Sequence, residues 1–122
     1  MLFSIILVLY NECFFLINIY CFRGGILFIS VSDLLKIDRP NIIDIRSREK
    51  FNDNHIPGAL NINGTFLMNT PEKYLNRTDI YYIYCQYGVS SKTVVKMLRM
   101  RGYNVVSVIG GYEAWILKWI FL

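Results

Sequence analysis

Short apolar runs alternate with polar stretches of helical periodicity along most of this 122-residue chain. Continuous apolar, β-branched or aromatic runs predict strands at 41–45, 59–62, 79–84 and 105–109. Helical patterns predict helices at 33–36, 47–54, 71–76, 90–101 and 112–119. Such alternation is typical of an α/β fold, in which a parallel sheet carries helices on both faces.

Three positions mark the ends of these helices. Ser32 is a suitable N-cap for a helix that begins at Asp33 and ends before Pro40. Pro71 suits the first position of the helix that it opens, because its missing N–H has no partner there. Gly102 follows the longest helical stretch and suits the C′ position, where a left-handed conformation ends a helix.

The first 22 residues follow a different pattern, since eighteen of them are apolar and the first basic residue is Arg23. A membrane anchor at 1–22 fits this length, although Glu12 would cost roughly 2.5–3.5 kcal/mol on insertion. Two other interpretations stay open, a cleaved secretory signal and a start assigned upstream of the true one. We therefore divide the chain into an apolar extension at 1–29 and one domain at 30–122.

The thiol of Cys85 stands between the strand at 79–84 and the helix at 90–101. Backbone N–H groups of the six residues that follow can curl around its sulfur, and the helix directs the positive end of its dipole toward it. A thiolate is stabilised in such a place, and the thiolate is the nucleophilic form of cysteine. Gly88 fits the position in this turn that needs conformational freedom.

The remaining cysteine and histidine content indicates neither a disulfide framework nor a metal site. Cys13 and Cys21 lie in the apolar N-terminal stretch, and His55 is the single histidine. No metal-ligand spacing links them to Cys85. We expect a protein of a reduced compartment with one reactive thiol, no metal and no organic cofactor.

The formal net charge of +4 comes mainly from the region after residue 29. Lys92, Lys96 and Arg99 share one face of the helix predicted at 90–101, and we interpret this face as a solvated surface. A second hypothesis is that these bases steer a small anion toward Cys85. Nucleic-acid binding is not expected, because no aromatic residues are interleaved with the bases and no binding motif accompanies them.

Three separated motifs give the chain from about residue 30 to 119 a resemblance to the single-domain rhodanese family. The first is Ile43-Asp44-Ile45-Arg46, followed by Phe51 and by the segment from His55 to Ile62. The second is the loop from Tyr84 to Ser91, and the third is Gly110-Gly111-Tyr112-Glu113-Ala114-Trp115. The resemblance implies a three-layer α/β fold, with a central parallel sheet of about five strands and helices on both faces.

The resemblance also implies a sulfurtransferase that carries a sulfane sulfur on Cys85 as a persulfide. Thiosulfate or a persulfide would be the small anionic donor, and cyanide, a small-molecule thiol or a thioredoxin-like protein would be the acceptor. The implied substrate-binding residues are Arg46 and the loop residues Gln86, Tyr87, Gly88, Val89, Ser90 and Ser91. The reduced compartment indicated by the cysteine content favours a cytoplasmic location, with membrane association through residues 1–22 as an open alternative. A non-catalytic rhodanese-like binding module is the alternative function.

Loop length separates this chemistry from that of the cysteine phosphatases built on a similar fold. The run from Cys85 to Ser90 has the six residues of the sulfurtransferase loop, whereas the phosphatase loop is one residue longer. Cysteine phosphatases also carry an arginine six positions after the nucleophile to clamp phosphoryl oxygens, and this chain has Ser91 there. We therefore do not expect phosphatase activity.

Several residues outside the loop have structural interpretations. We expect Asp44 and Arg46 to form an ion pair, with contact of Arg46 to the loop or to an anionic substrate as the alternative. His55 is expected to hold a turn by hydrogen bonding. Trp115 and Trp119 are expected to pack on one face of their helix. Tyr87, which lies on the loop itself, has a functional interpretation instead, in which it walls the substrate pocket and influences donor choice.

Overall fold

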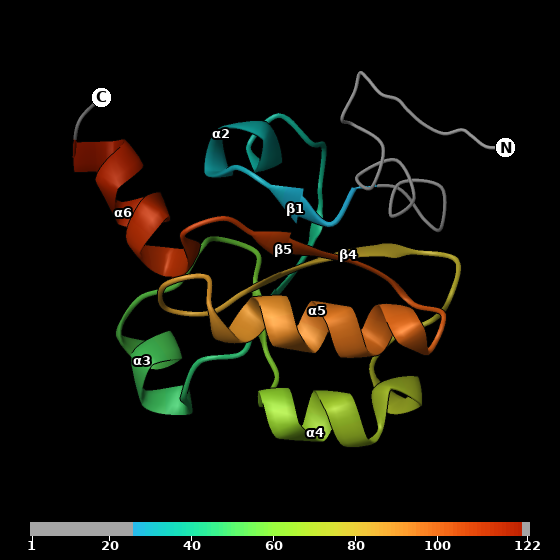
Figure 1. Ribbon diagram of the computed structural model, residues 1–122. Helices are drawn as coiled ribbons and strands as arrows, with labels where there is room; N and C mark the ends of the chain where they lie inside the picture. Colours follow the sequence, from blue (N-terminus) through green and yellow to red (C-terminus); the bar gives the residue numbers. More distant parts are fainter. Residues whose placement is uncertain (1–25, 121–122) are drawn as a thin grey trace, which may run out of the picture.

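The computed structural model describes residues 26–120. A five-stranded parallel sheet runs through the molecule between two helical layers, in the strand order β1-β5-β4-β2-β3 (Figure 1). The predicted α/β architecture with a sheet of about five parallel strands is therefore confirmed. The strands are β1 (Phe28–Ile29), β2 (Asn41–Asp44), β3 (Leu60–Asn61), β4 (Ile80–Tyr84) and β5 (Asn104–Val108).

Each face of the sheet is covered by helices that contribute to a separate apolar core. Leu67, Val94 and Leu98 pack on one face, together with Ile83 of β4. Leu34 and Tyr112 belong to the core on the other face. The helices are α2 (Val31–Leu34), α3 (Arg48–Asp53), α4 (Gly64–Asn69), the 3₁₀ helix η1 (Pro71–Lys73), α5 (Ser90–Met100) and α6 (Gly111–Ile120).

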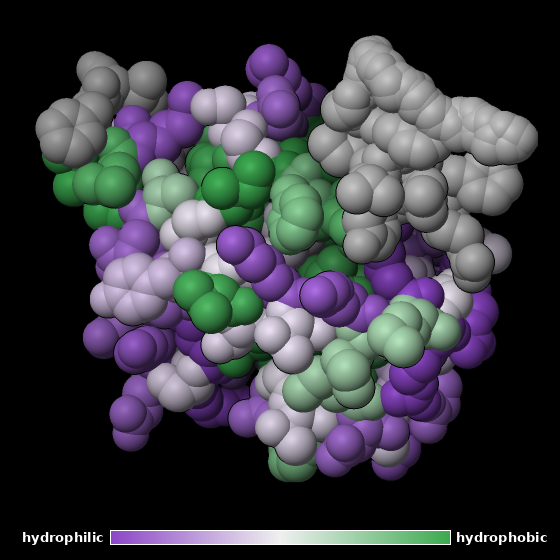
Figure 2. All heavy atoms as spheres, in the orientation of Figure 1, coloured by the Kyte–Doolittle hydropathy of each residue, from purple (hydrophilic) through white to green (hydrophobic). Residues whose placement is uncertain are grey.

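The helix α5 confirms the amphipathic pattern seen in the sequence. Val94 and Leu98 are buried against the sheet, whereas Lys92 and Lys96 are exposed. Polar side chains are spread among apolar ones across the face of the molecule on which α5 lies (Figure 2). The helix ends where expected, since Gly102 follows the C-cap residue with a φ of +92°, a value that favours glycine.

The start of α2 differs from the prediction. Ser30, not Ser32, is the N-cap, and its Oγ accepts a hydrogen bond from the N–H of Asp33 at 3.1 Å. Ser30 has the extended backbone typical of a cap, with φ −78° and ψ 160°, while Ser32 lies inside the helix. Both serines precede Leu34, so the residue types alone do not select between them.

Two short elements are absent from the predicted pattern. The strand β1 pairs Phe28 with Ser107 and Ile29 with Val108, so residues just before position 30 complete one edge of the sheet. The helix α4 precedes Pro71, and Leu67 is its one fully buried side chain. Pro71 does open a helix, as expected, but this is the short 3₁₀ helix η1 and not a helix that reaches residue 76.

The interpretations of residues 1–22 lie outside the described residues. These interpretations were a membrane anchor, a cleaved signal and a start assigned upstream. Within residues 26–120, every helix is too short or too polar to cross a bilayer.

Candidate active site

Cys85 lies at the carboxyl end of β4, directly after the fully buried Tyr84. The strand β4 is central in the sheet, with β5 on one side and β2 on the other. Open parallel sheets place their ligand sites at this end of the strands. The thiol is 7% exposed, and α5 begins five residues later at Ser90.

The loop after Cys85 turns hydrogen-bond donors toward its sulfur. The backbone N–H of Gly88 lies 3.1 Å from Sγ and that of Ser91 lies 3.3 Å away. The Oγ of Ser91 is 3.5 Å from the same sulfur. Of the six amides that the sequence led us to expect around the sulfur, those of Gly88 and Ser91 donate to it at these distances, and the amide of Tyr87 also contributes to stabilising its charge.

These contacts shift the acid–base equilibrium of the thiol. Burial of Cys85 raises its pKa, because a charge is less stable away from water. Hydrogen bonds from the Ser91 side chain, and from the N–H groups of Ser91, Gly88 and Tyr87, lower the pKa and outweigh burial. The pKa of Cys85 therefore lies below its ordinary value of 9.0, so the thiolate forms more readily than in an ordinary cysteine.

The first turn of α6 holds the loop in this orientation. The N–H of Tyr112 donates to the carbonyl of Cys85 at 2.9 Å, and the N–H of Glu113 donates to the carbonyl of Gln86 at 3.0 Å. These are N–H groups at the start of a helix, which have no partner within the helix itself. Because the carbonyls face α6, the amides of the same loop are free to face the sulfur.

Two glycines allow the loop and α6 to approach this closely. A Cβ on Gly88 would lie 2.7 Å from the backbone nitrogen of Gly110, and one on Gly111 would lie 2.8 Å from the nitrogen of Gly88. Both residues also have positive φ, +87° and +60° respectively. The predicted need for glycine at position 88 is therefore confirmed, and its cause is the contact with Gly110 as well as φ.

A second hydroxyl lies behind Ser91. The Oγ atoms of Ser91 and Ser107 are 2.8 Å apart, and both side chains are buried. Ser107 comes from β5, where it is flanked by Val106 and Val108. Sequence reasoning missed this residue, although a lone hydroxyl in an otherwise apolar strand was a signal that could have found it.

Arg46 forms the expected ion pair with Asp44. Its Nη2 lies 2.8 Å from Asp44 Oδ2, and its Nε lies 3.1 Å from both carboxylate oxygens. Tyr84 donates its hydroxyl hydrogen to the same carboxylate at 2.6 Å. Burial raises the pKa of Tyr84, so its hydroxyl stays protonated as a donor.

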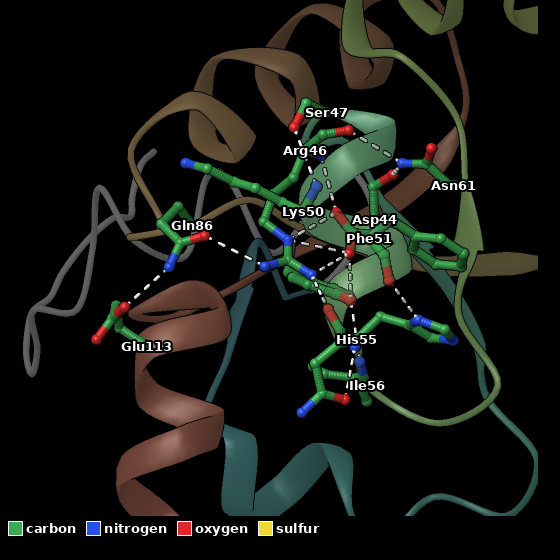
Figure 3. A network of polar contacts seen from close by, with 12 residues as sticks. Asp44, Arg46, Ser47, Lys50, Phe51, His55, Ile56, Asn61, Gln86 and Glu113 are labelled. Atoms are coloured by element: carbon green, nitrogen blue, oxygen red, sulfur yellow. Dashed lines mark hydrogen bonds and ion pairs between the residues drawn. The ribbon is translucent and has the colours of Figure 1, made fainter.

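Arg46 also reaches the loop, through the side chain of Gln86. Figure 3 shows the guanidinium between Asp44 and Gln86, and Nη1 lies 3.2 Å from Gln86 Oε1. The amide of Gln86 continues to Glu113, with Nε2 at 2.8 Å from Oε2. The contacts from Asp44 through Arg46 and Gln86 to Glu113 thus connect β2 to α6, and Gln86 is the residue directly after Cys85.

A pocket of about 290 Å³ lies beside Gln86. It is lined by Arg46, Lys50, Asp53, Asn54, Gln86 and Tyr112. Tyr87 is not among its lining residues, and the tyrosine side chain is 67% exposed. The side chains of Val89 and Ser90 are exposed as well, whereas Gly88 and Ser91 direct their backbone N–H groups at the sulfur.

The residues with structural interpretations lie as expected. His55 Nδ1 is 2.8 Å from the carbonyl of Phe51, and the two rings stack with centroids 3.8 Å apart. Trp115 and Trp119 pack edge to face at 5.2 Å. The His55 contacts hold the turn after α3, and the tryptophan pair packs along α6. The polar contact of His55 is with Phe51 and not with Cys85.

Comparisons with known proteins agree with the family that the three sequence motifs resemble. A family model described as rhodanese-like domain matches residues 30–118. The thiosulfate sulfurtransferase GlpE of Shewanella oneidensis is 31% identical over 94 residues, which cover 71% of this chain and 89% of that protein. The adenylyltransferase and sulfurtransferase uba4 of Ogataea parapolymorpha is 32% identical over 88 residues, 71% of this chain but only 23% of that longer protein.

A solved structure shows the same architecture. The human single-domain sulfurtransferase TSTD1 superposes with a TM-score of 0.68 at 27% identity. The superposition covers 77% of this chain and 98% of the human one. The likeness therefore extends over nearly the whole of that protein and not over an isolated motif.

Proposed function

The chain belongs to the rhodanese-like family, and from this premise we propose that it is a sulfurtransferase that carries a sulfane sulfur as a persulfide on Cys85. One observation carries the proposal. The buried Sγ of Cys85 accepts backbone hydrogen bonds from Gly88 and Ser91 at the carboxyl end of a central strand. These fixed dipoles stabilise a negative sulfur without a separate general base.

The first half of the reaction loads the cysteine. With thiosulfate as donor, the Cys85 thiolate attacks the outer sulfur and a new S–S bond forms. The S–S bond of thiosulfate breaks, and sulfite leaves with the electron pair. The product is Cys85–S–S⁻, and no oxidant or reductant is consumed because one S–S bond replaces another.

The second half of the reaction unloads it. A thiolate or cyanide attacks the outer sulfur, the S–S bond to Cys85 breaks, and the electron pair returns to Sγ. Cyanide leaves as thiocyanate and a thiol leaves as its persulfide. The Gly88 and Ser91 donors stabilise the Cys85 thiolate as the leaving group, so the same loop serves both halves.

We propose that the substrate is held by the backbone of the loop from Gln86 to Ser91. The exposed side chains of Tyr87 and Val89 border its approach to Cys85. Arg46 supports the loop through Gln86, because its guanidinium already donates to Asp44, to the carbonyl of Asn54 and to Gln86. A small anionic donor and a thiol acceptor, either a small molecule or a thioredoxin-like protein, fit this arrangement.

Intact-mass measurement after incubation of the full chain with thiosulfate tests this function. We expect a gain of one sulfur atom, located by peptide mapping on the peptide that contains Cys85, and its loss on addition of cyanide. Cys85→Ser, which keeps Cys13 and Cys21, is the control and should gain nothing. A folded wild-type chain that gains no sulfur from thiosulfate or from an organic persulfide contradicts the proposal and favours a binding module.

A further inference from the structure

Ser107 is a buried hydroxyl that the reaction as described does not use. Its side chain is 1% exposed, and its Oγ lies 2.8 Å from that of Ser91. Among the residues that the structure describes, Ser91 is the one hydrogen-bond partner of this hydroxyl. A buried hydroxyl with a single partner is costly unless its hydrogen has an acceptor.

The thiolate and the neutral thiol of Cys85 differ in whether the hydroxyl hydrogens of Ser107 and Ser91 both have an acceptor. If Cys85 is a thiolate, Ser107 donates to Ser91 and Ser91 donates to Sγ. Both hydroxyl hydrogens then have an acceptor, and the negative sulfur has a hydroxyl donor in addition to the backbone amides. All three side chains, those of Ser107, Ser91 and Cys85, then have hydrogen-bond partners.

A neutral thiol satisfies the same three groups less well. If the S–H donates to Ser91, either hydroxyl can donate to the other, but the hydrogen of the hydroxyl that accepts then has no acceptor among the side-chain contacts of the described residues. If the S–H points elsewhere, the hydroxyls face a neutral sulfur, which is a weak acceptor. The buried pair therefore discriminates between thiolate and thiol.

We propose that Ser107 is a positioning residue for Cys85, because it fixes the Ser91 hydroxyl as a donor to Sγ and so favours the thiolate. The contribution of Ser107 to sulfur transfer rests on the function proposed above, whereas its effect on the thiolate does not. In the persulfide the charge moves to the outer sulfur. The hydroxyl pair thus stabilises the unloaded thiolate more than the loaded state, and it assists the step in which Sγ leaves.

The rate of Cys85 alkylation by iodoacetamide against pH tests this role in the full chain. Following the peptide that contains Cys85 separates its reaction from those of Cys13 and Cys21. We expect Ser107→Ala to move the midpoint of the profile to higher pH and to lower the rate below the midpoint about threefold to tenfold. Adding Ser107→Ala to Ser91→Ala should produce no further shift, since Ser107 acts through Ser91.

Val106→Ala is the matched control, because it weakens the same buried strand at the position next to Ser107, whose side chain points to the opposite face of the sheet. It should lower stability and leave the pH midpoint unchanged. An unchanged midpoint in Ser107→Ala overturns the positioning role. So does a midpoint shift by Ser107→Ala that is equally large in the wild-type chain and in the Ser91→Ala variant. Should Ser107→Ala fail to fold, Ser107→Val also lacks the hydroxyl and is judged by the same two criteria.

Alkylation needs no sulfur donor, so the two proposals fail separately. A shifted midpoint in a protein that never forms a persulfide supports the positioning role and contradicts the sulfurtransferase. Persulfide formation with an unshifted midpoint supports the sulfurtransferase and contradicts the role of Ser107.

Discussion

At the scale of single residues, the fully buried carboxylate of Asp44 organises the wall beside the loop. It accepts from Arg46 through both the side chain and the backbone N–H, and it accepts from the hydroxyl of Tyr84. Tyr84 in turn accepts from the N–H of Ile56 at 3.1 Å. A buried charge is tolerated only when it is paired and hydrogen-bonded, so each of these donors matters.

Tyr84→Phe tests this network. The substitution removes a donor from Asp44 and leaves the N–H of Ile56 without its acceptor, both in the interior. We expect a loss of about 1–3 kcal/mol in the free energy of unfolding, measured by urea denaturation. Tyr82→Phe, in the same strand, removes a hydroxyl without a hydrogen bond among the described residues, and an equal loss there would contradict the explanation.

At the scale of elements, the contact between the loop and the start of α6 decides the shape of the site. The helix supplies the N–H groups of Tyr112 and Glu113 to the loop carbonyls. Gly111 allows the approach, because a Cβ there would contact the backbone of Cys85, Gln86 and Gly88. The third sequence motif, from Gly110 to Trp115, thus helps to orient the loop amides.

Gly111→Ala should therefore disturb the loop as well as the helix. We expect a loss of roughly 2–5 kcal/mol in unfolding free energy, and a rise of the Cys85 alkylation midpoint toward that of a free thiol. Gly58→Ala is the control, because Gly58 also has positive φ, +88°, yet has open space where the Cβ would lie. It should cost about 1–2 kcal/mol and leave the alkylation profile unchanged, and a similar profile in both variants would refute the steric account.

Elements with strong periodicity could be predicted from the sequence, and short ones could not. The strand β4 and the helix α5 have long apolar patterns, and both lie within a residue of their expected bounds. The helix α4 has six residues and buries only Leu67, so packing and the Asn63 cap stabilise it more than any repeat does. The strand β1 has two residues and forms the end of the segment 1–29 that the sequence pattern assigns to the apolar extension, where no alternation marks it.

At the scale of the whole molecule, the sheet brings residues that are distant in sequence together at the carboxyl ends of its strands. Cys85 follows β4, Arg46 follows β2, and Gly111 follows β5. The nucleophile and its loop could be predicted because they are contiguous in sequence. The Ser91–Ser107 and Gln86–Glu113 contacts could not, since each depends on how α5 or α6 packs against the sheet.

The lowered pKa of Cys85 links the site to global stability. A depressed acid pKa contributes stability that is complete above the unfolded-state pKa and is lost as the pH falls through the folded-state pKa. The difference in unfolding free energy between wild type and Cys85→Ser should therefore shift in favour of the wild type as the pH rises toward 9.0, and then level off. Urea denaturation across this range checks it, and a shift in the opposite direction would show that the fold disfavours the thiolate.

The path of the sulfur atom is the most direct test of the central claim that Cys85 carries sulfane sulfur. Thiosulfate labelled with radioactive sulfur at its outer position is given to the full chain, and cyanide follows. We predict label on the Cys85 peptide before cyanide and in thiocyanate afterwards, and no label when the inner sulfur of thiosulfate carries it. Label that reaches thiocyanate without residing on Cys85, or a folded chain that acquires none, would contradict the account.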